Sequence, residues 1–264
     1  MSKTSKKPRL LVEERRRRIS EMLEVQERVT VEELVGRFCV SAVTIRGDLD
    51  ALAAAGSVIR SHGGALKRIN DPEDIPITVK ETLHHAEKVR IGHAAAQMIH
   101  DGETIMLDSG STTMEIARQI RFLRLKGLTV ITNALNVAME LASLPHVRLI
   151  MIGGILRQMS YSLVGPHAEH TLRALHADRL FLGVDDLDPE IGLMTPDVLE
   201  AQLNAVMIQV SREVVVVADH SKFQRRSLSV IGRIDAVQKV ITDSGIAPEI
   251  VAAVRAHNVE VLVV

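Results

Sequence analysis

The sequence of 264 residues has few aromatic side chains, no tryptophan and a single cysteine. Aromatic residues make up only 2% of the chain, so its core must be built from aliphatic side chains and methionine. Single-stranded nucleic acids are usually bound by stacking bases on aromatic rings, which argues against that class of partner. The lone Cys39 cannot form an intrachain disulfide, and we predict a cytoplasmic protein in which Cys39 is buried in a turn.

Long apolar runs are also missing from the sequence. No stretch of about 18 apolar residues occurs, so we predict that no segment spans a membrane. The basic N-terminus has no apolar segment behind its charges and does not look like a secretory signal.

The net charge of −1 hides an asymmetry between the two ends of the chain. The first 70 residues contain 14 Lys and Arg against 9 Asp and Glu, a net charge of +5. The remaining residues contain 18 against 24, a net charge of −6. A basic head on an acidic body indicates that the head binds a polyanion.

The first 68 residues predict three helices followed by a hairpin. Thr30 and Glu33 have the spacing of a capping box that opens a short second helix. Ser41 is placed to cap a third helix whose apolar residues recur at helical spacing. Two β-prone runs flank Gly63 and Gly64, which predicts a tight hairpin. This order of elements is typical of a winged helix-turn-helix domain.

A polar segment with two prolines separates this head from the rest of the chain. Beyond it, apolar runs alternate with amphipathic helices, which predicts an open, mostly parallel α/β sheet covered on both faces. The predicted strands are residues 104–107, 128–132, 147–152, 179–184, 214–218, 239–242 and 259–263. We divide the chain into a DNA-binding domain (residues 1–68), a linker (69–80) and an effector-binding domain (81–264).

The third helix of the head carries the candidate residues for reading DNA. Arg46 can donate two parallel hydrogen bonds to a guanine edge or grip a phosphate. Ser41, Ala42 and Thr44 lie near the start of this helix, where hydroxyls and the helix dipole favour phosphate. Further phosphate contacts are predicted from Arg60 and His62 on the wing and from residues 15–18. Each basic residue alone also fits a solvated surface charge; their combination with the helix-turn-helix pattern predicts double-stranded DNA as the partner.

A second candidate site lies where the predicted strands of the larger domain end. Residues 108–113, read as DSGSTT, follow a strand and open a helix. Backbone N–H groups, hydroxyls and a helix N-terminus converge there, which is suited to phosphate, although a Ser/Thr-rich helix cap also fits. Polar residues follow other strands, and ligands of open α/β sheets bind at the carboxyl ends of the strands. The predicted effector-binding residues are Asp108, Ser109, Gly110, Ser111, Thr112, Thr113, Asn133, Gly153, Gly154, Asp185 and Lys222.

Several strings resemble the DeoR family of bacterial repressors. Residues 31–66 carry VS…TIR.DL…G…R.HGGA, which is similar to the family's N-terminal signature. The strings DSGSTTMEIA, TNALNVA and VVVVADHSKF resemble its C-terminal domain, which is related to ribose-phosphate isomerases and glucosamine-phosphate deaminases. The resemblance covers about residues 11–245. It implies that residues 109–113 bind phosphate, that Asn133, Gly153 and Gly154 line the pocket, and that Lys222 contacts the ligand.

Other strings narrow the resemblance within the family. LGVDDLD, EAQLN and DHSKF are most similar to the branch that represses N-acetylgalactosamine catabolism. The chain departs from the family at Gly47, where a second arginine is usual, and at residues 197–200, which are less acidic than the family pattern. The first departure removes one DNA-contacting side chain from the predicted recognition helix.

We therefore predict a sequence-specific repressor of sugar catabolism genes that acts as a homo-oligomer, a dimer or a tetramer. Its effector is predicted to be an amino-sugar or ketohexose phosphate, with no cofactor. The alternative is a sugar-phosphate isomerase or deaminase with an accessory DNA-binding head, using Asp185, Asp186 or Asp188 for acid–base chemistry. Residues 189–196 hold one glycine and no lysine, unlike the lysine loop of the isomerases, so we favour a regulator that is not an enzyme.

Histidines provide a further alternative, a metal site. They gather in the sequence at positions 84, 85, 93 and 100, and again at 167, 170 and 176. No cysteine and histidine pair has the spacing of zinc ligands. We interpret these histidines as solvated residues on helix faces and predict no metal site.

Overall fold

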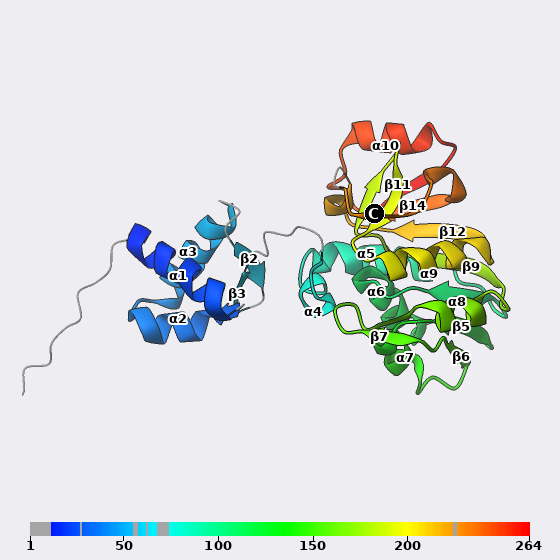
Figure 1. Ribbon diagram of the computed structural model, residues 1–264, viewed down its shortest axis with the longest axis horizontal. Helices are drawn as coiled ribbons and strands as arrows, with labels where there is room; N and C mark the ends of the chain where they lie inside the picture. The colour runs from blue at the N-terminus through cyan, green and yellow to red at the C-terminus, as the bar shows by residue number, and fades with distance from the viewer. Residues whose placement is uncertain (1–11, 27, 55–57, 62, 68–73, 224–225) are drawn as a thin grey trace, which may run out of the picture. The chain divides into compact units, whose positions relative to one another are not determined.

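The computed structural model describes residues 12–26, 28–54, 58–61, 63–67, 74–223 and 226–264. The chain forms two compact units, Met1–Pro72 and Glu73–Val264 (Figure 1). Residues 77–80, which the sequence analysis places in the linker, form a helix of the second unit. Within the described residues, no helix combines the length and apolar character that a membrane crossing requires.

The smaller unit is a winged helix-turn-helix, as predicted. Its elements are α1 (Val12–Gln26), β1 (Arg28–Thr30), α2 (Val31–Phe38), α3 (Ala42–Ala54), β2 (Val58–Ser61) and β3 (Gly64–Lys67). Strands β2 and β3 pair antiparallel around the predicted turn. Strand β1 was not predicted; it pairs with β3 and is too short to show an alternating pattern in the sequence.

Side-chain caps fix the starts of the second and third helices. The Thr30 hydroxyl accepts a hydrogen bond from Glu33 N (3.2 Å), and the Glu33 carboxylate accepts one from Thr30 N (2.8 Å), confirming the capping box. The Ser41 hydroxyl accepts from Thr44 N (3.1 Å) at the start of α3. Cys39 ends α2 in the left-handed conformation (φ 54°) and is exposed, so the prediction of a buried cysteine was wrong. The turn that carries it runs over the surface, as connecting segments usually do.

The larger unit has an α/β fold with a sheet of seven parallel strands. Its helices are α4 (Ile77–Lys80), α5 (His85–Ala96), α6 (Ser111–Ile120), α7 (Leu135–Leu141), α8 (Pro166–Leu172), α9 (Val198–Gln209) and α10 (Pro248–Arg255), with 3-10 turns η1 (His220–Lys222) and η2 (Ile234–Ala236). The large sheet contains β4 (Thr104–Leu107), β5 (Leu128–Thr132), β6 (Val147–Met151), β9 (Ala177–Leu182), β12 (Ser211–Val217), β14 (Lys239–Thr242) and β15 (Glu260–Val263). These seven strands correspond to the seven predicted from the sequence.

The strand order of this sheet is β15-β14-β12-β9-β4-β5-β6, and every pairing in it is parallel. The chain therefore builds outward from β4 in one direction through β5 and β6, and from β9 in the other direction through β12, β14 and β15. The neighbouring strands β4 and β9 flank the point where the order reverses. Crevices at such a point are the usual ligand sites of open α/β sheets.

The centre of the sheet is buried on both faces. On β4, Ile105 and Leu107 pack with helices α5, α6 and α7, whereas Met106 packs with α8, α9 and α10 on the opposite face. This alternation explains why the strands read as continuous apolar runs.

Two small antiparallel sheets were not predicted. Strand β7 (Ile155–Arg157) pairs with β8 (Ser162–Val164), and β11 (Gly192–Thr195) pairs with both β10 (Asp186–Asp188) and β13 (Ser229–Gly232). Each of these strands has three or four residues, too few for a clear pattern in the sequence.

Candidate functional site

The outer face of α3 is accessible, as a recognition helix requires. Ser41 and Arg46 are exposed and Ala42 and Thr44 are half-buried, whereas Ile45 is fully buried in the core of the head. Val43, which was not predicted to contact DNA, is 75% exposed beside these polar residues. An exposed apolar side chain on this face suits contact with a thymine methyl group.

Not all predicted phosphate contacts are free to bind DNA. Arg15 is buried, and its guanidinium lies 2.5 Å from the Asp48 carboxylate, with Arg16 at 3.1 Å on the other oxygen. Arg15 therefore joins α1 to α3 and was wrongly predicted to contact phosphate. Arg60 bonds to Asp50 (2.7 Å) and to a backbone carbonyl within the hairpin, so a phosphate would have to compete for it. The predicted His62 lies outside the described residues.

A pocket lies at the carboxyl ends of β4 and β9, and seven of the predicted effector residues line it. They are Asp108, Ser109, Gly110, Ser111, Thr112, Asp185 and Lys222. Nine residues that were not predicted complete the lining: Ile77, Lys80, Met159, Ser160, Gly183, Val184, Thr195, Glu200 and Asn204. The pocket has a volume of about 530 Å³, counting the open space at its mouth. Four acids or amides and two lysines among the lining side chains indicate a small, polar and charged ligand.

The start of α6 forms one wall of this pocket. Gly110 precedes the helix, and a Cβ there would lie 3.0 Å from the Thr113 hydroxyl and 3.2 Å from the Asp108 carboxylate, so a glycine suits the crowding. The Thr113 hydroxyl is buried and accepts from Gly110 N (2.9 Å), which makes it a helix cap that does not line the pocket. The first N–H groups of a helix have no partner inside it, so those of Ser111 and Thr112 are available to an anion.

Asp108 is held between the two strands that flank the pocket. Its carboxylate accepts hydrogen bonds from Gly110 N (3.1 Å) and Gly183 N (3.0 Å), and only 3% of the residue is exposed. Burial raises the pKa of Asp108 to about 7, and the nearby charge of Glu200 acts in the same direction. Asp108 can therefore change its protonation state near neutral pH.

Two lysines share one carboxylate across the pocket. Lys80 Nζ lies 2.5 Å from Asp185 Oδ1, and Lys222 Nζ lies 3.9 Å from the same oxygen. The Thr195 hydroxyl donates to the other oxygen (3.1 Å). Burial raises the pKa of Asp185, but the charges of Lys80 and Lys222 outweigh it and hold the pKa below its ordinary value. Lys80 comes from α4, which the sequence analysis assigned to the linker.

Glu200 anchors the far wall of the pocket. Its Oε1 accepts hydrogen bonds from the Ser160 and Ser162 hydroxyls, and its Oε2 lies 3.5 Å from the Arg157 guanidinium. These residues come from separate segments, so no spacing in the sequence indicated that they meet. The only available signal was Glu200 itself, an acid in the first turn of a predicted helix.

Three other predicted residues do not line the pocket. Asn133 is buried and its side-chain amide donates to Leu163 O (3.3 Å), so it fastens the end of β5 to β8. Gly153 and Gly154 lie between β6 and β7, where a Cβ on Gly154 would meet Val164 O at 2.7 Å. These residues shape the neighbouring hairpin.

Two of the three acids considered for acid–base chemistry, Asp186 and Asp188, accept hydrogen bonds from other groups of the larger unit. Asp186 accepts from the Ser227 hydroxyl (2.5 Å). Asp188 accepts from Glu190 N (2.9 Å) and Ile191 N (3.2 Å), which closes the turn between β10 and β11. Of the three acids proposed for acid–base chemistry, Asp185 alone lines the pocket.

Comparison with known proteins identifies both units. Residues 15–70 match the DeoR-like helix-turn-helix domain, and residues 83–244 match the DeoR C terminal sensor domain. A candidate aga operon transcriptional repressor of Escherichia coli O157:H7 is 40% identical over 95% of this chain and 93% of its own length. The transcriptional repressor AccR of Agrobacterium fabrum is 36% identical over 88% of this chain and 90% of its own.

A third relative, the glycerol-3-phosphate regulon repressor of Escherichia coli K12, is 32% identical over 92% of this chain and 95% of its own. Among solved structures, a ribose 5-phosphate isomerase of Methanocaldococcus jannaschii aligns with a TM-score of 0.40 and 19% identity, covering 53% of this chain and 55% of its own.

Proposed function

The chain belongs to the DeoR family, and we propose that it is a sequence-specific repressor of sugar catabolism genes whose DNA binding is controlled by a phosphorylated sugar. Relatives named for the aga operon and the glycerol-3-phosphate regulon support a role in carbohydrate metabolism. The observation that carries the proposal is the pocket between β4 and β9, where the start of α6 faces Lys80 and Lys222.

Double-stranded operator DNA is the proposed partner of the smaller unit. Helix α3 would enter the major groove, with Arg46 on a base edge and Val43 against a thymine methyl group. Ser41 and Thr44 would hold the adjacent phosphate. Val43 and Arg46, which lie about one turn apart on α3, are both exposed, and Ser41 is exposed at the start of the helix, which supports this assignment.

A sugar phosphate is the proposed ligand of the larger unit. Its phosphate would lie at the start of α6, bonded to the N–H groups of Ser111 and Thr112 and to the hydroxyls of Ser109 and Ser111. The carboxylates of the pocket would accept hydrogen bonds from the sugar hydroxyls or from an amino group. An amino-sugar or ketohexose phosphate matches this combination of anion-binding and hydroxyl-binding groups.

The ligand would act by competing for the two lysines. Lys80 and Lys222 both pair with Asp185, and a phosphate would draw these cations toward itself. Lys80 ends α4, the first helix of the larger unit, so its movement would be transmitted to the chain that leads to the head. Allosteric coupling is typically about 1–3 kcal/mol, so about 5- to 150-fold weaker operator binding is expected.

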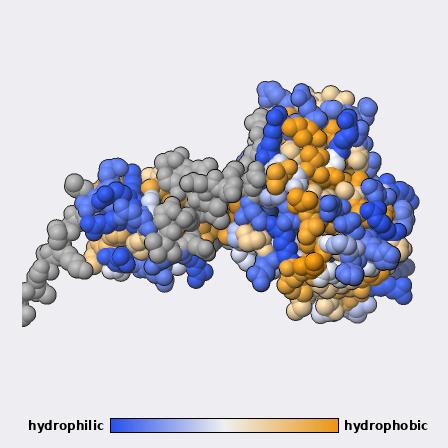
Figure 2. All heavy atoms as spheres, in the orientation of Figure 1, coloured by the Kyte–Doolittle hydropathy of each residue, from blue (hydrophilic) through white to orange (hydrophobic). Residues whose placement is uncertain are grey.

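Self-association is proposed because helix-turn-helix proteins read paired half-sites as dimers. Figure 2 shows hydrophobic residues gathered on the viewed face of the larger unit. Exposed apolar side chains on α7 and β7 include Leu135, Met139, Ile155 and Leu156. Exposed apolar surface of this kind often marks a protein–protein contact, and a second copy of the chain is the proposed occupant.

A thermal-shift panel of phosphorylated and free sugars tests the proposal. A ligand at 100 times its Kd stabilises the folded state by about 2.7 kcal/mol, so a true effector raises the Tm clearly. We expect an amino-sugar or ketohexose phosphate to raise the Tm and the free sugar to leave it unchanged. Lys222→Met should reduce the shift at the same ligand concentration, whereas Lys239→Met, which removes an ion pair with Glu260 elsewhere on the sheet, should preserve it.

The same samples distinguish a regulator from an enzyme. We expect the stabilising sugar phosphate to weaken binding of the full chain to operator DNA and to be recovered chemically unchanged. Turnover of the sugar phosphate without any effect on DNA binding would favour the isomerase or deaminase alternative. A Tm shift from the free sugar alone would refute the phosphate site.

A further inference from the structure

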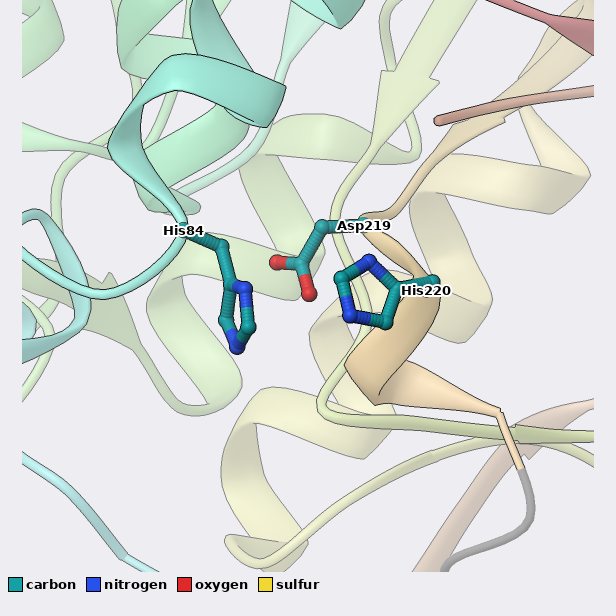
Figure 3. A group of neighbouring side chains, drawn as sticks. All are labelled: His84, Asp219 and His220. Atoms are coloured by element: carbon teal, nitrogen blue, oxygen red, sulfur yellow. The ribbon is translucent and has the colours of Figure 1, made fainter. Parts of the chain in front are cut away.

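Two histidines and an aspartate that lie far apart in the sequence meet beside the pocket. His84 immediately precedes α5, while Asp219 and His220 follow β12 and begin η1. Figure 3 shows their three side chains facing one another. We propose that His84, Asp219 and His220 bind a divalent transition metal ion, with Zn²⁺ as the best match.

The ligand atoms are close enough to share one ion. One nitrogen from each imidazole and one Asp219 oxygen all lie within 4.8 Å of one another. The two imidazole rings are 4.8 Å apart between centroids and nearly perpendicular, at 81°. Zinc bonds to nitrogen and oxygen are about 2.0–2.2 Å long, so a small closing movement brings all three side chains onto one ion.

Asp219 offers an oxygen that accepts no hydrogen bond from the described residues and lies 3.9 Å from Lys88 Nζ. Its Oδ1 accepts from Ser221 N (3.0 Å) and from the Ser221 hydroxyl (2.5 Å). Its Oδ2 is buried and, among the described residues, has no hydrogen-bond donor. Buried polar atoms are nearly always hydrogen-bonded, and the Lys88 charge at 3.9 Å gives this oxygen no such bond, so it is a candidate metal ligand. A metal ion between Asp219 and the histidines would satisfy it.

His220 is already oriented as a metal ligand. Its Nδ1 lies 2.8 Å from Asp243 Oδ2, and the Asp243 carboxylate also accepts from His220 N (2.7 Å) and Gly245 N (2.9 Å). A histidine that binds a metal usually donates its other ring N–H to such a carboxylate, which fixes the tautomer and the ring plane. This arrangement leaves Nε2 of His220 for the ion.

Lys88 is the positive charge that lies against Asp219 Oδ2 and opposes a cation there, with Lys80 and Lys222 close enough to Lys88 to add to the repulsion. Its Nζ lies 3.9 Å from Asp219 Oδ2, beyond hydrogen-bonding distance, and instead donates to Lys80 O (2.5 Å) and Leu83 O (2.7 Å). The repulsion weakens the site without blocking it. Removing this charge with Lys88→Met should therefore strengthen metal binding, a result that a purely structural Lys88–Asp219 pair does not predict.

The donor set favours zinc over magnesium or calcium. Imidazole nitrogens suit Zn²⁺ and its neighbours, whereas Mg²⁺ and Ca²⁺ prefer oxygen ligands. Three protein ligands leave a fourth position open for water or for a ligand oxygen. A bound ion would also connect the segment after Lys80 to the turn that carries Lys222. Because both lysines line the pocket, and if the function proposed above holds, the ion would change the affinity for the sugar phosphate.

Titration of the full chain, with no affinity tag and with Cys39→Ser to remove the exposed thiol, tests the site. Zn²⁺ or Co²⁺ is added without any sugar phosphate and followed by calorimetry, by Co²⁺ absorption and by Tm. We expect one ion per chain and a Tm increase that a chelator reverses. His84→Gln and His220→Gln should each weaken binding at least about tenfold. The matched control, His85→Gln, changes the adjacent histidine and should bind normally.

Several outcomes overturn the proposal. Equal binding by the His84→Gln and His220→Gln variants, a loss at His85→Gln as large as at His84→Gln, or the absence of saturable binding would each do so. His84 is exposed, so His84→Gln keeps the fold and preserves the test even if His220→Gln does not. Repeating the sugar-phosphate Tm panel in chelator separates the two proposals, since the effector shift should persist there.

Discussion

Lys80 Nζ lies 2.5 Å from Asp185 Oδ1, and this contact joins the first helix of the sensor domain to the floor of its pocket. Helix α4 is only four residues long, and Ile77 at its start is 2% exposed. The ion pair of Lys80 and the burial of Ile77 together hold this short helix against the rest of the larger unit. Under the function proposed above, a ligand that attracts Lys80 away from Asp185 would act on the chain that leads to the DNA-binding head.

Substituting Lys80 should separate ligand binding from its effect on DNA. Hydrogen bonds to charged groups contribute about 1.5–3 kcal/mol, so Lys80→Met and Lys222→Met should each weaken the sugar phosphate about 10- to 150-fold. At saturating ligand, Lys222→Met should still release operator DNA and Lys80→Met should not. Fluorescence anisotropy of labelled operator measures both. Equal release by the two variants would show that α4 does not carry the signal.

Arg46→Ala should abolish specific operator binding while leaving the ligand-induced Tm shift intact. A bidentate contact to a base contributes about 1–3 kcal/mol of discrimination. Arg46→Lys keeps the charge but loses the planar fork, so it should retain non-specific binding and lose sequence preference. Competition between operator and random DNA at fixed salt measures the difference. Unchanged retention on operator DNA by Arg46→Ala would contradict the recognition-helix assignment.

Gly47 lies on the exposed side of α3, and a Cβ there would meet no atom within 4 Å. Gly47→Ala should therefore stabilise the head by about 0.5–1 kcal/mol, because glycine is costly within a helix. Gly47→Arg restores the arginine usual in the family and should tighten DNA binding with a steeper dependence on salt. Denaturant unfolding and salt titrations measure the two effects. A destabilised Gly47→Ala variant would be the contrary result.

Asp48→Asn should destabilise the DNA-binding head. Asp48 is 2% exposed and accepts hydrogen bonds from both Arg15 and Arg16, which lie on α1. Breaking a buried ion pair by removing one partner typically costs about 3–5 kcal/mol. Thermal unfolding should show an earlier transition for the head with the sensor domain unchanged. The matched variant Asp50→Asn, in an exposed pair with Arg60, should change stability by less than about 1 kcal/mol.

The pKa of Asp108, which burial raises from 3.8 to about 7, predicts a dependence of stability on pH. Between these two values the folded protein keeps a proton that the unfolded chain has lost. The free energy of unfolding should therefore fall as pH rises through this window because of Asp108, and level off above about pH 7. Asp108→Asn, a neutral substitute, should gain stability relative to the wild type over the same window. Urea unfolding at several pH values checks this, and a difference independent of pH would contradict it.

Much of the architecture could be predicted because it depends on local patterns. The capping box of Thr30 and Glu33, the cap at Ser41 and the Gly-turned hairpin each reflect contacts between residues a few positions apart. The inner strands of the large sheet are largely buried on both faces, so they read as apolar runs. Short strands such as β1 and β7 were not predicted, because three residues are too few to show the alternating pattern of a strand.

The sequence by itself determined the division into two units, the order of elements in the head and the start of α6, because those depend on neighbours along the chain. Only the tertiary structure decided that Arg15 pairs with Asp48, that Lys80 and Glu200 join the pocket, and that His84 reaches His220. These contacts connect residues on separate elements, and their geometry is set by the order of strands around β4 and β9. Side-chain chemistry can be read from a sequence, but which groups meet depends on how the chain folds back on itself.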